Sequence, residues 1–179
     1  MTALVRPDIR LHASWAEAMA EHHPESLHVS GAGLWMLPEG EQWDLTEAGC
    51  RRLVDVLLAE AHRSPDDDEV VPCEFFWITD GPEERPEVVG FLALRTRLNE
   101  WLLNEGGHIG YSVRPSRRRQ GHASRALGLA LRRSAELGID RALVTCDDDN
   151  DASARTIERN GGVYEDTRNG KRRYWVPTS

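Results

Sequence analysis

The spacing of apolar residues changes part-way along the chain, from a helical period to the clustering that is typical of strands. Ser14 and Glu17 stand at the spacing of a capping box, which predicts a helix over 14–22. Apolar residues then recur every three or four positions up to Ala61. This pattern predicts a second amphipathic helix, with Thr46 as its N-cap.

Strand patterns begin after two irregular stretches. Residues 23–43 show no clear period, and 64–68 join Ser and Pro to three aspartates, so both are expected to be loops. Aromatic and β-branched residues then dominate 73–79 and 88–97, on either side of a turn rich in Gly and Pro. This arrangement predicts a hairpin.

The rest of the chain alternates strands with helices. We expect a strand over 107–113, a helix over 123–137, a strand over 142–146, a helix from Asn150 or Asp151 to 160, and a hairpin that turns at 168–171. The order predicts a single domain over 1–179, of the α/β or α+β class, with helices on both faces of a mixed sheet.

The most informative stretch joins the strand over 107–113 to the helix that follows it. Pro115 ends the strand because it has no N–H for a ladder, and Gly121 stands where the helix begins. The first N–H groups of a helix have no internal partner and carry its positive dipole end, so they favour a phosphate. Arg117, Arg118 and Arg119 add positive charge. The alternative is a solvated basic loop before an ordinary helix.

Charge is concentrated around this stretch. Residues 114–133 contain seven arginines and no acid, so they carry +7, whereas the whole chain carries −8 and the remainder therefore −15. An acidic protein with one basic segment is better suited to holding a compact anion than to binding nucleic acid in general.

Within this segment, residues 118–123 read R-x-x-G-x-A. This sequence resembles the [QR]-x-x-G-x-[GA] acyl-CoA motif of the GNAT N-acetyltransferase superfamily, and 111–115 resemble the end of that family's central strand, V-x-P. The resemblance follows the element order over about 73–176, and its specific motifs lie in 107–162. Its other parts are Leu143–Cys146, Asn150–Ser153 and Asn160–Gly162.

The resemblance implies a mostly antiparallel sheet, splayed between 107–113 and 141–147, with acetyl-CoA in the cleft. It also implies that the pantetheine arm pairs with the backbone of 111–113, that the N–H groups of 119–124 hold the pyrophosphate, and that Asn150 contacts the pantetheine side. The implied cofactor-binding residues are Tyr111, Ser112, Val113, Arg118, Arg119, Gln120, Gly121, His122, Ala123, Ser124, Asn150 and Ser153.

The resemblance further implies direct attack of an amine on the thioester, with the backbone N–H near Val113 stabilising the developing oxyanion. The chain departs from the family at two positions. Ile157 stands where the family commonly has a tyrosine that acts as the general acid. Thr145 stands where the family often has a glutamate that acts as the general base. The tyrosines that could replace the acid are Tyr111, Tyr164 and Tyr174.

His108 is the expected catalytic base, because an ordinary histidine pKa suits proton abstraction near neutral pH. A structural histidine bonded to backbone is the alternative. Glu105 and Asp147 are the other candidates for the base, and a water-mediated reaction without one dedicated base is also open.

The acceptor pocket is expected to come largely from 1–70, whereas 71–179 would form the acyl-CoA core. Arg95 and Arg97 would bind a carboxylate on the acceptor if they face the cleft, although exposure to solvent is the default for arginine. A core position is favoured over the pocket for four large apolar residues, Trp15, Trp35, Met36 and Trp43.

The sequence therefore predicts an acetyl-CoA-dependent N-acetyltransferase acting on a primary amine of a small molecule or peptide. The alternative is an acyl-CoA sensor or a degenerate, non-catalytic member. Three widely spaced cysteines make no disulfide or metal motif, so no metal is expected. The same cysteines fit a reducing cytoplasm, and we expect a monomer or homodimer that does not bind nucleic acid. We expect no membrane association, because no apolar run is long enough to span a bilayer.

Overall fold

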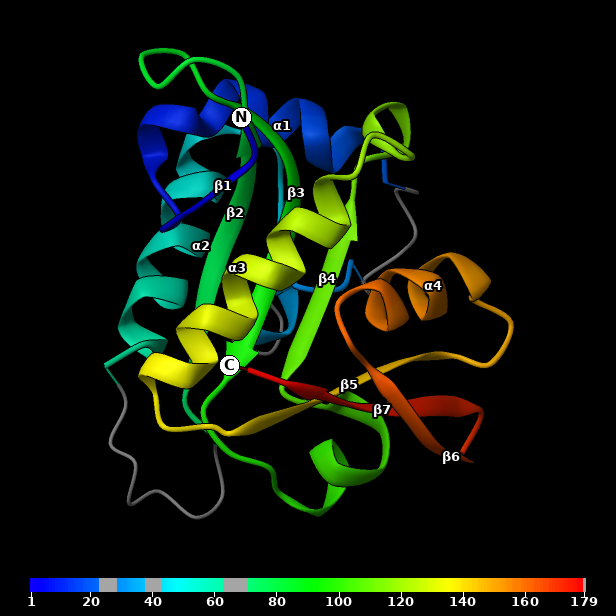
Figure 1. Ribbon diagram of the computed structural model, residues 1–179. Coiled ribbons are helices and arrows are strands. Elements are labelled where there is room, and N and C mark those ends of the chain that lie inside the picture. The colour runs from blue at the N-terminus through cyan, green and yellow to red at the C-terminus, as the bar shows by residue number, and fades with distance from the viewer. Residues whose placement is uncertain (23–28, 38–42, 63–70, 179) are drawn as a thin grey trace.

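A computed structural model describes residues 1–22, 29–37, 43–62 and 71–178, which fold around one sheet (Figure 1). The loop expected at 64–68 and much of the irregular stretch 23–43 lie outside the described residues. The helices are α1 (His12–Ala20), α2 (Glu47–Glu60), α3 (His122–Glu136) and α4 (Asp151–Arg159). The strands are β1 (Ala3–Val5), β2 (Cys73–Asp80), β3 (Glu87–Arg95), β4 (Ile109–Val113), β5 (Arg141–Asp147), β6 (Val163–Arg168) and β7 (Lys171–Pro177).

The sheet runs in the order β1-β2-β3-β4-β5-β7-β6, and every neighbouring pair is antiparallel except β4 and β5. The expected fold class, a mixed and mostly antiparallel sheet with helices on both faces, is confirmed. The division of the chain at residue 70 stays a prediction.

The sheet parts between β4 and β5. These strands share a single register pair, Ile109 with Val144, whereas β3 and β4 pair over five positions. His108 closes the joint from the other side, because its N–H donates to the carbonyl of Leu143 (2.7 Å) and its Nδ1 accepts from the N–H of Leu143 (2.9 Å). Beyond Ile109 the two strands diverge, so the backbone edge of β4 faces the gap.

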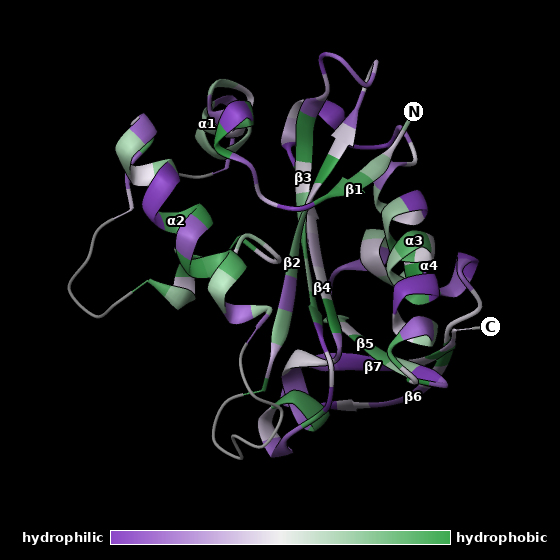
Figure 2. Cartoon of the chain, turned by 90° about the vertical axis from the view of Figure 1, so that its left-hand side faces the viewer, coloured by the Kyte–Doolittle hydropathy of each residue, from purple (hydrophilic) through white to green (hydrophobic). Residues whose placement is uncertain are grey.

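Two apolar clusters hold the helices against opposite faces of the sheet (Figure 2). One cluster joins α1 and α2 to β2 and β3 through Trp15, Leu53 and Phe75. The other packs α3 and α4, through Leu127 and Ile157, against residues of β2, β3, β4, β5 and β7. Because this cluster runs across both sides of the gap, core packing on the α3 and α4 face holds the two parts of the sheet together where the strand pairing stops.

The structure confirms two of the predicted helix N-caps and contradicts a third. Thr46 caps α2 by accepting from the N–H of Gly49 (3.1 Å), and Asn150 caps α4 by accepting from the N–H of Ser153 (3.0 Å). The capping box at Ser14 is wrong, because α1 begins at His12 and the Ser14 hydroxyl instead accepts from the N–H of Val88 on β3. A tertiary hydrogen bond has replaced the local one.

The sequence patterns also missed two elements. The N-terminal strand β1 pairs with the edge of β2, and its three residues are too few to show a period. A π-helical turn, η3 (Leu102–Gly106), precedes β4. Short 3-10 turns complete the chain, η1 (Ile9–Leu11), η2 (Leu34–Met36) and η4 (Pro115–Arg117).

Gly107, which connects η3 to β4, is predicted to be intolerant of a side chain. Its φ of +65° and ψ of −178° lie in a region that is open essentially only to glycine, and a Cβ there would lie 2.7 Å from the Leu143 carbonyl oxygen. We expect Gly107→Ala to lower the free energy of unfolding by about 3 kcal/mol. Gly138→Ala is the matched control, because its φ of +78° is similar but nothing lies within 4 Å, and it should cost about 1 kcal/mol. Equal losses in urea unfolding would contradict the steric argument.

Candidate active site

Two cavities meet where β4 and β5 part. The first has a volume of about 1050 Å³ and lies between the end of β4, the loop before α3, and α4. The second has a volume of about 550 Å³ and extends towards η2 and η3. Both are lined by Val29, Ser30, Tyr111, Asn150 and Ser153. The parted strands therefore open a continuous site with two compartments.

The N-terminus of α3 forms the wall of the first cavity. Arg119 and Gly121 have φ angles of +64° and +83°, and these left-handed residues turn successive N–H groups in one direction. Within the described part of the chain, the backbone N–H groups of 119–124 donate no hydrogen bond. We call residues 119–124 the cradle. Its geometry suits an anion with several oxygens, because each free N–H can donate to one of them.

The edge of β4 lines the same cavity. Arg95 donates its N–H to the carbonyl of His108, and Arg114 donates to that of Val89, which fixes the residues whose backbone groups face β3. By alternation along the strand, the backbone groups of Tyr111 and Val113 face the gap. The Ser112 hydroxyl is buried in the cavity wall and has no hydrogen-bond partner among the described residues. The Ser112 hydroxyl and the backbone groups of Tyr111 and Val113 are therefore available to hydrogen-bond a ligand in this cavity.

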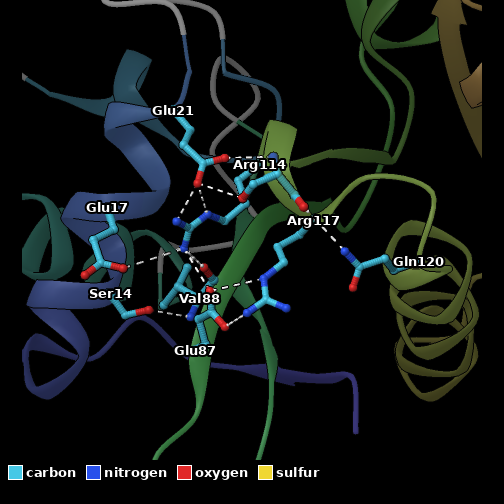
Figure 3. A network of polar contacts seen from close by, with 9 residues as sticks. Ser14, Glu17, Glu21, Glu87, Val88, Arg114, Arg117 and Gln120 are labelled. Atoms are coloured by element: carbon cyan, nitrogen blue, oxygen red, sulfur yellow. Dashed lines mark hydrogen bonds and ion pairs between the residues drawn. The ribbon is translucent and has the colours of Figure 1, made fainter.

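Part of the positive charge before α3 is structural. The buried Arg114 guanidinium donates to Glu21 (Nε to Oε1, 2.7 Å) and to Glu87 (3.2 Å), and Arg117 also pairs with Glu87 (Figure 3). Burial opposes ionisation of Glu21, but bonds from Arg114 and from the N–H and hydroxyl of Ser116 lower its pKa to about 2. The expectation that Arg117 adds mobile charge beside the anion is corrected, because Glu87 holds it.

Four other arginines line the first cavity, namely Arg118, Arg119, Arg155 and Arg159, and none of them forms an ion pair within the described chain. Arg118 donates to the carbonyl of Val113 (3.1 Å), which ties its side chain to the end of β4. The cavity therefore has a positively charged wall, in which these four arginines have no carboxylate partner among the described residues.

His122 takes part in the cradle through its backbone rather than its ring. The ring is buried at 3% exposure, and its Nδ1 lies 2.9 Å from the Thr2 hydroxyl, which also accepts from Arg125. The ring therefore packs against the N-terminal segment instead of facing the cavity solvent. Burial lowers the pKa of His122, with the Arg125 charge acting in the same direction and Asp80 opposing it.

Tyr111 spans the gap between the parted strands. Its hydroxyl lies 2.9 Å from the Ser153 hydroxyl at the start of α4, and Asn150 caps the same helix. Burial raises the pKa of Tyr111 to about 12, so the phenol is neutral and able to donate a proton or hydrogen bond at neutral pH. Tyr164 and Tyr174, the other candidate acids, line neither cavity.

His108 lies behind the site rather than in it. It lines neither cavity, and burial together with the Arg95 charge lowers its pKa to about 4. Because Nδ1 accepts from Leu143, the proton of the neutral ring is on Nε2, and no basic nitrogen is left to take a proton from an amine. Catalysis by His108 stays a prediction that these contacts do not favour.

The second cavity carries acidic and aromatic groups. Glu105 and Asp147, the two alternative bases, both line it, and so do Trp35, Trp101 and Arg95. The predicted core position of Trp35 is therefore wrong, because its side chain forms part of a cavity wall.

The two departures from the family motif have structural explanations. Ile157 is fully buried under α4, and the Thr145 hydroxyl donates to the Glu105 carbonyl (2.6 Å), which fastens β5 to η3. Cys146 on β5 is buried and also lines the second cavity.

Comparison with known families agrees with this geometry. The family model described as acetyltransferase (GNAT) domain matches residues 12–163. The chain belongs to the GNAT acetyltransferase family. No curated protein matches it in sequence.

Solved GNAT structures share its fold. RimJ from Mycobacterium smegmatis in complex with CoA-disulfide is 19% identical, with a TM-score of 0.67 over 98% of this chain and 81% of that one. Microcin C7 self immunity acetyltransferase MccE, in complex with acetyl-CoA and AMP, is 14% identical, with a TM-score of 0.65 over 98% and 92%. A Salmonella typhimurium acetyltransferase that modifies the N-terminal serine of ribosomal protein L7/L12 is 18% identical, with a TM-score of 0.58 over 98% and 94%.

Neither a metal-binding cluster nor a membrane-spanning helix occurs among the described residues. They contain no group of three or more His, Cys, Asp or Glu side chains placed to hold a metal ion. They also contain no helix of the length and apolarity needed to cross a bilayer.

The Glu21–Arg114 pair is predicted to stabilise the loop before α3 in a pH-dependent way. Glu21→Gln leaves a buried guanidinium short of one carboxylate, so we expect the free energy of unfolding to fall by about 1–3 kcal/mol at neutral pH. The folded pKa lies below the ordinary value of 4.5, so this stability is present above about pH 4.5 and is lost as the pH falls towards 2. Urea unfolding at several pH values would measure it.

Glu47→Gln is the control for this measurement, because Glu47 forms only an exposed i,i+4 pair with Arg51 and should contribute less than about 0.5 kcal/mol. If Glu21→Gln were as stable as the parent at neutral pH, the network in Figure 3 would not anchor the loop.

Proposed function

We propose that this GNAT acetyltransferase moves the acetyl group of acetyl-CoA to an amine by direct attack in the cleft between β4 and β5. The observation that carries the proposal is the free cradle of N–H groups beside a strand edge that β5 leaves open. A diphosphate can accept hydrogen bonds from the cradle, and an amide-bearing arm can pair with the open edge of β4. CoA contains both groups.

The residues present fit this cosubstrate. The N–H groups of 119–124 would hold the diphosphate, with charge from Arg118 and Arg119. The backbone of Tyr111 and Val113 would pair with the pantetheine amides, and the Ser112 hydroxyl, which lacks a partner among the described residues, would gain one. Asn150 and Ser153 would contact the arm from α4. Acetyl-CoA supplies the acetyl thioester.

The backbone N–H of Val113 would polarise the carbonyl, because it faces the gap at the end of β4. The amine nitrogen forms the new C–N bond, the C–S bond breaks, and the electron pair leaves with sulfur. Tyr111 would give its proton to the thiolate, or hydrogen-bond it, since the neutral phenol lies between the two cavities.

The proton of the amine would go to Asp147 or Glu105, directly or through water. Both carboxylates line the second cavity, where an acceptor can enter without passing the cradle. His108 would then act as a positioning residue that holds β4 to β5 where the strands meet.

A second candidate function is a CoA-binding module without turnover. It is favoured by Ile157 and Thr145, which cannot replace the acid and base common in the family. The two functions differ in one measurement, since only the enzyme releases CoA thiol when amines are supplied with acetyl-CoA.

The cradle is tested with Gly121→Glu. The new carboxylate would lie where the diphosphate is held, so we expect acetyl-CoA affinity, measured by calorimetry, to fall at least about 100-fold. Gly138→Glu is the matched control, because it adds the same side chain at a similar positive φ beyond the opposite end of α3 and should bind normally. Parent-like affinity in Gly121→Glu would overturn the assignment.

The proposed acid is tested with Tyr111→Phe. We expect kcat to fall roughly 10- to 100-fold with acetyl-CoA affinity little changed, since a thiolate leaves tolerably well without full protonation. Tyr164→Phe is the control, because that exposed hydroxyl bonds only Thr167. An unchanged kcat in Tyr111→Phe would remove Tyr111 from the reaction.

A further inference from the structure

One guanidinium in the second cavity has no acidic partner. Arg95, at the end of β3, donates from Nη1 to the carbonyl of Gly106 at a long 3.4 Å, and its guanidinium lies 5.6 Å from the centre of the Trp35 ring. No carboxylate of the described chain pairs with it. Burial of the guanidinium lowers the pKa of Arg95, because desolvation disfavours the charged form.

The two arginines that are buried in the described part of the fold are compensated, whereas Arg95 is half-buried. Arg114 pairs with Glu21 and Glu87, and Arg173 pairs with Glu165 and Asp166. A desolvated cation is costly unless an anion balances it, so Arg95 differs from them in a way that points to a missing partner.

The position of Arg95 suits a ligand rather than a structural contact. A Cβ on Gly110 would lie 3.4 Å from its Nη1, so the guanidinium lies against β4, one residue beyond the joint with β5. Asp147 lines the same cavity three residues beyond that joint on β5. The cavity therefore has the Arg95 cation close to the joint, and Asp147, which pairs with Lys171, farther along β5.

The walls between these charges are aromatic. Trp35 and Trp101 line the cavity from η2 and from the turn before η3, and they are 48% and 56% exposed. Large exposed apolar side chains around a cavity indicate a ligand with an apolar body.

We propose that the acetyl acceptor is an amino acid, a small molecule with an apolar body whose carboxylate binds Arg95 while its amine faces the thioester. This inference rests on the proposed acetyl transfer and adds the class of acceptor. Arg95 is then a specificity-determining residue, because a guanidinium that stays unpaired with other amines penalises acceptors that lack the carboxylate.

The test compares apolar and aromatic L-amino acids with their amides, in which the carboxylate is replaced by a neutral group. For Arg95→Gln we expect kcat/KM to fall about 100-fold with the acids and to change little with the amides. Arg95→Lys keeps the charge but loses the forked geometry, so it should recover part of the loss. Arg51→Gln, which removes an exposed arginine on α2, is the control and should behave as the parent.

The outcomes separate the two proposals. If the parent acetylates amides or peptide N-termini as well as it acetylates the acids, and Arg95→Gln changes neither, the amino-acid acceptor is wrong while acetyl transfer stands. If the parent binds acetyl-CoA but releases no thiol with any acceptor, acetyl transfer fails, and direct calorimetry of the same amino acids with parent and Arg95→Gln decides the carboxylate site. An unaltered acetyl-CoA affinity shows that Arg95→Gln is folded.

Discussion

The site depends on how weakly β4 is joined to β5. One register pair and the double hydrogen bond between His108 and Leu143 hold the strands at one point, and beyond it the sheet is open. An unpaired strand edge in a sheet interior is unfavourable unless something satisfies its backbone groups. The apolar cluster under α3 and α4 continues from β2 and β3 to β5 and β7, so side-chain packing holds the two parts of the sheet together where the strand hydrogen bonds stop. The opening then leaves backbone donors and acceptors available to an extended ligand.

Charge compensation divides the arginines of the molecule into two groups. Arg114 and Arg117 are held by Glu21 and Glu87, and they fasten the loop before α3 to α1 and β3. Arginines that line the cavities, such as Arg118 and Arg95, have no such partner within the described chain. Sequence composition cannot separate these groups, since the acids that neutralise the first come from positions about 30 and 90 residues away in the chain. Only the fold shows which positive charges are left for ligands.

The sequence was most informative where function depends on the backbone. Gly121 and Pro115 fix local chain geometry, so the end of β4 and the start of α3 followed from residue types, whereas the bounds 119–124 of the cradle came from the resemblance to the family. Asn150 was found as a cap for the same reason. Side-chain roles were harder to predict, because they depend on tertiary contacts. The His108 ring accepts a hydrogen bond from the N–H of Leu143 on the neighbouring strand and so does not face the site. The Ser14 hydroxyl accepts from the N–H of Val88 on β3 instead of capping α1. The second cavity combines η2, η3 and four strands, and no periodic pattern links those segments.

The arrangement of charge also bears on how an amine could react here. The cradle is positive at the cofactor end, while Tyr111, Ser153 and Asn150 between the cavities are neutral. An unpaired Arg95 would repel an incoming ammonium group and already contributes to the low pKa of His108. A carboxylate on the acceptor would cancel the field of Arg95 as it binds, which leaves Lys171, already paired with Asp147, as the cation beside the carboxylates. Binding of the acceptor carboxylate to Arg95 would then also remove the charge repulsion that keeps the amine away from the site.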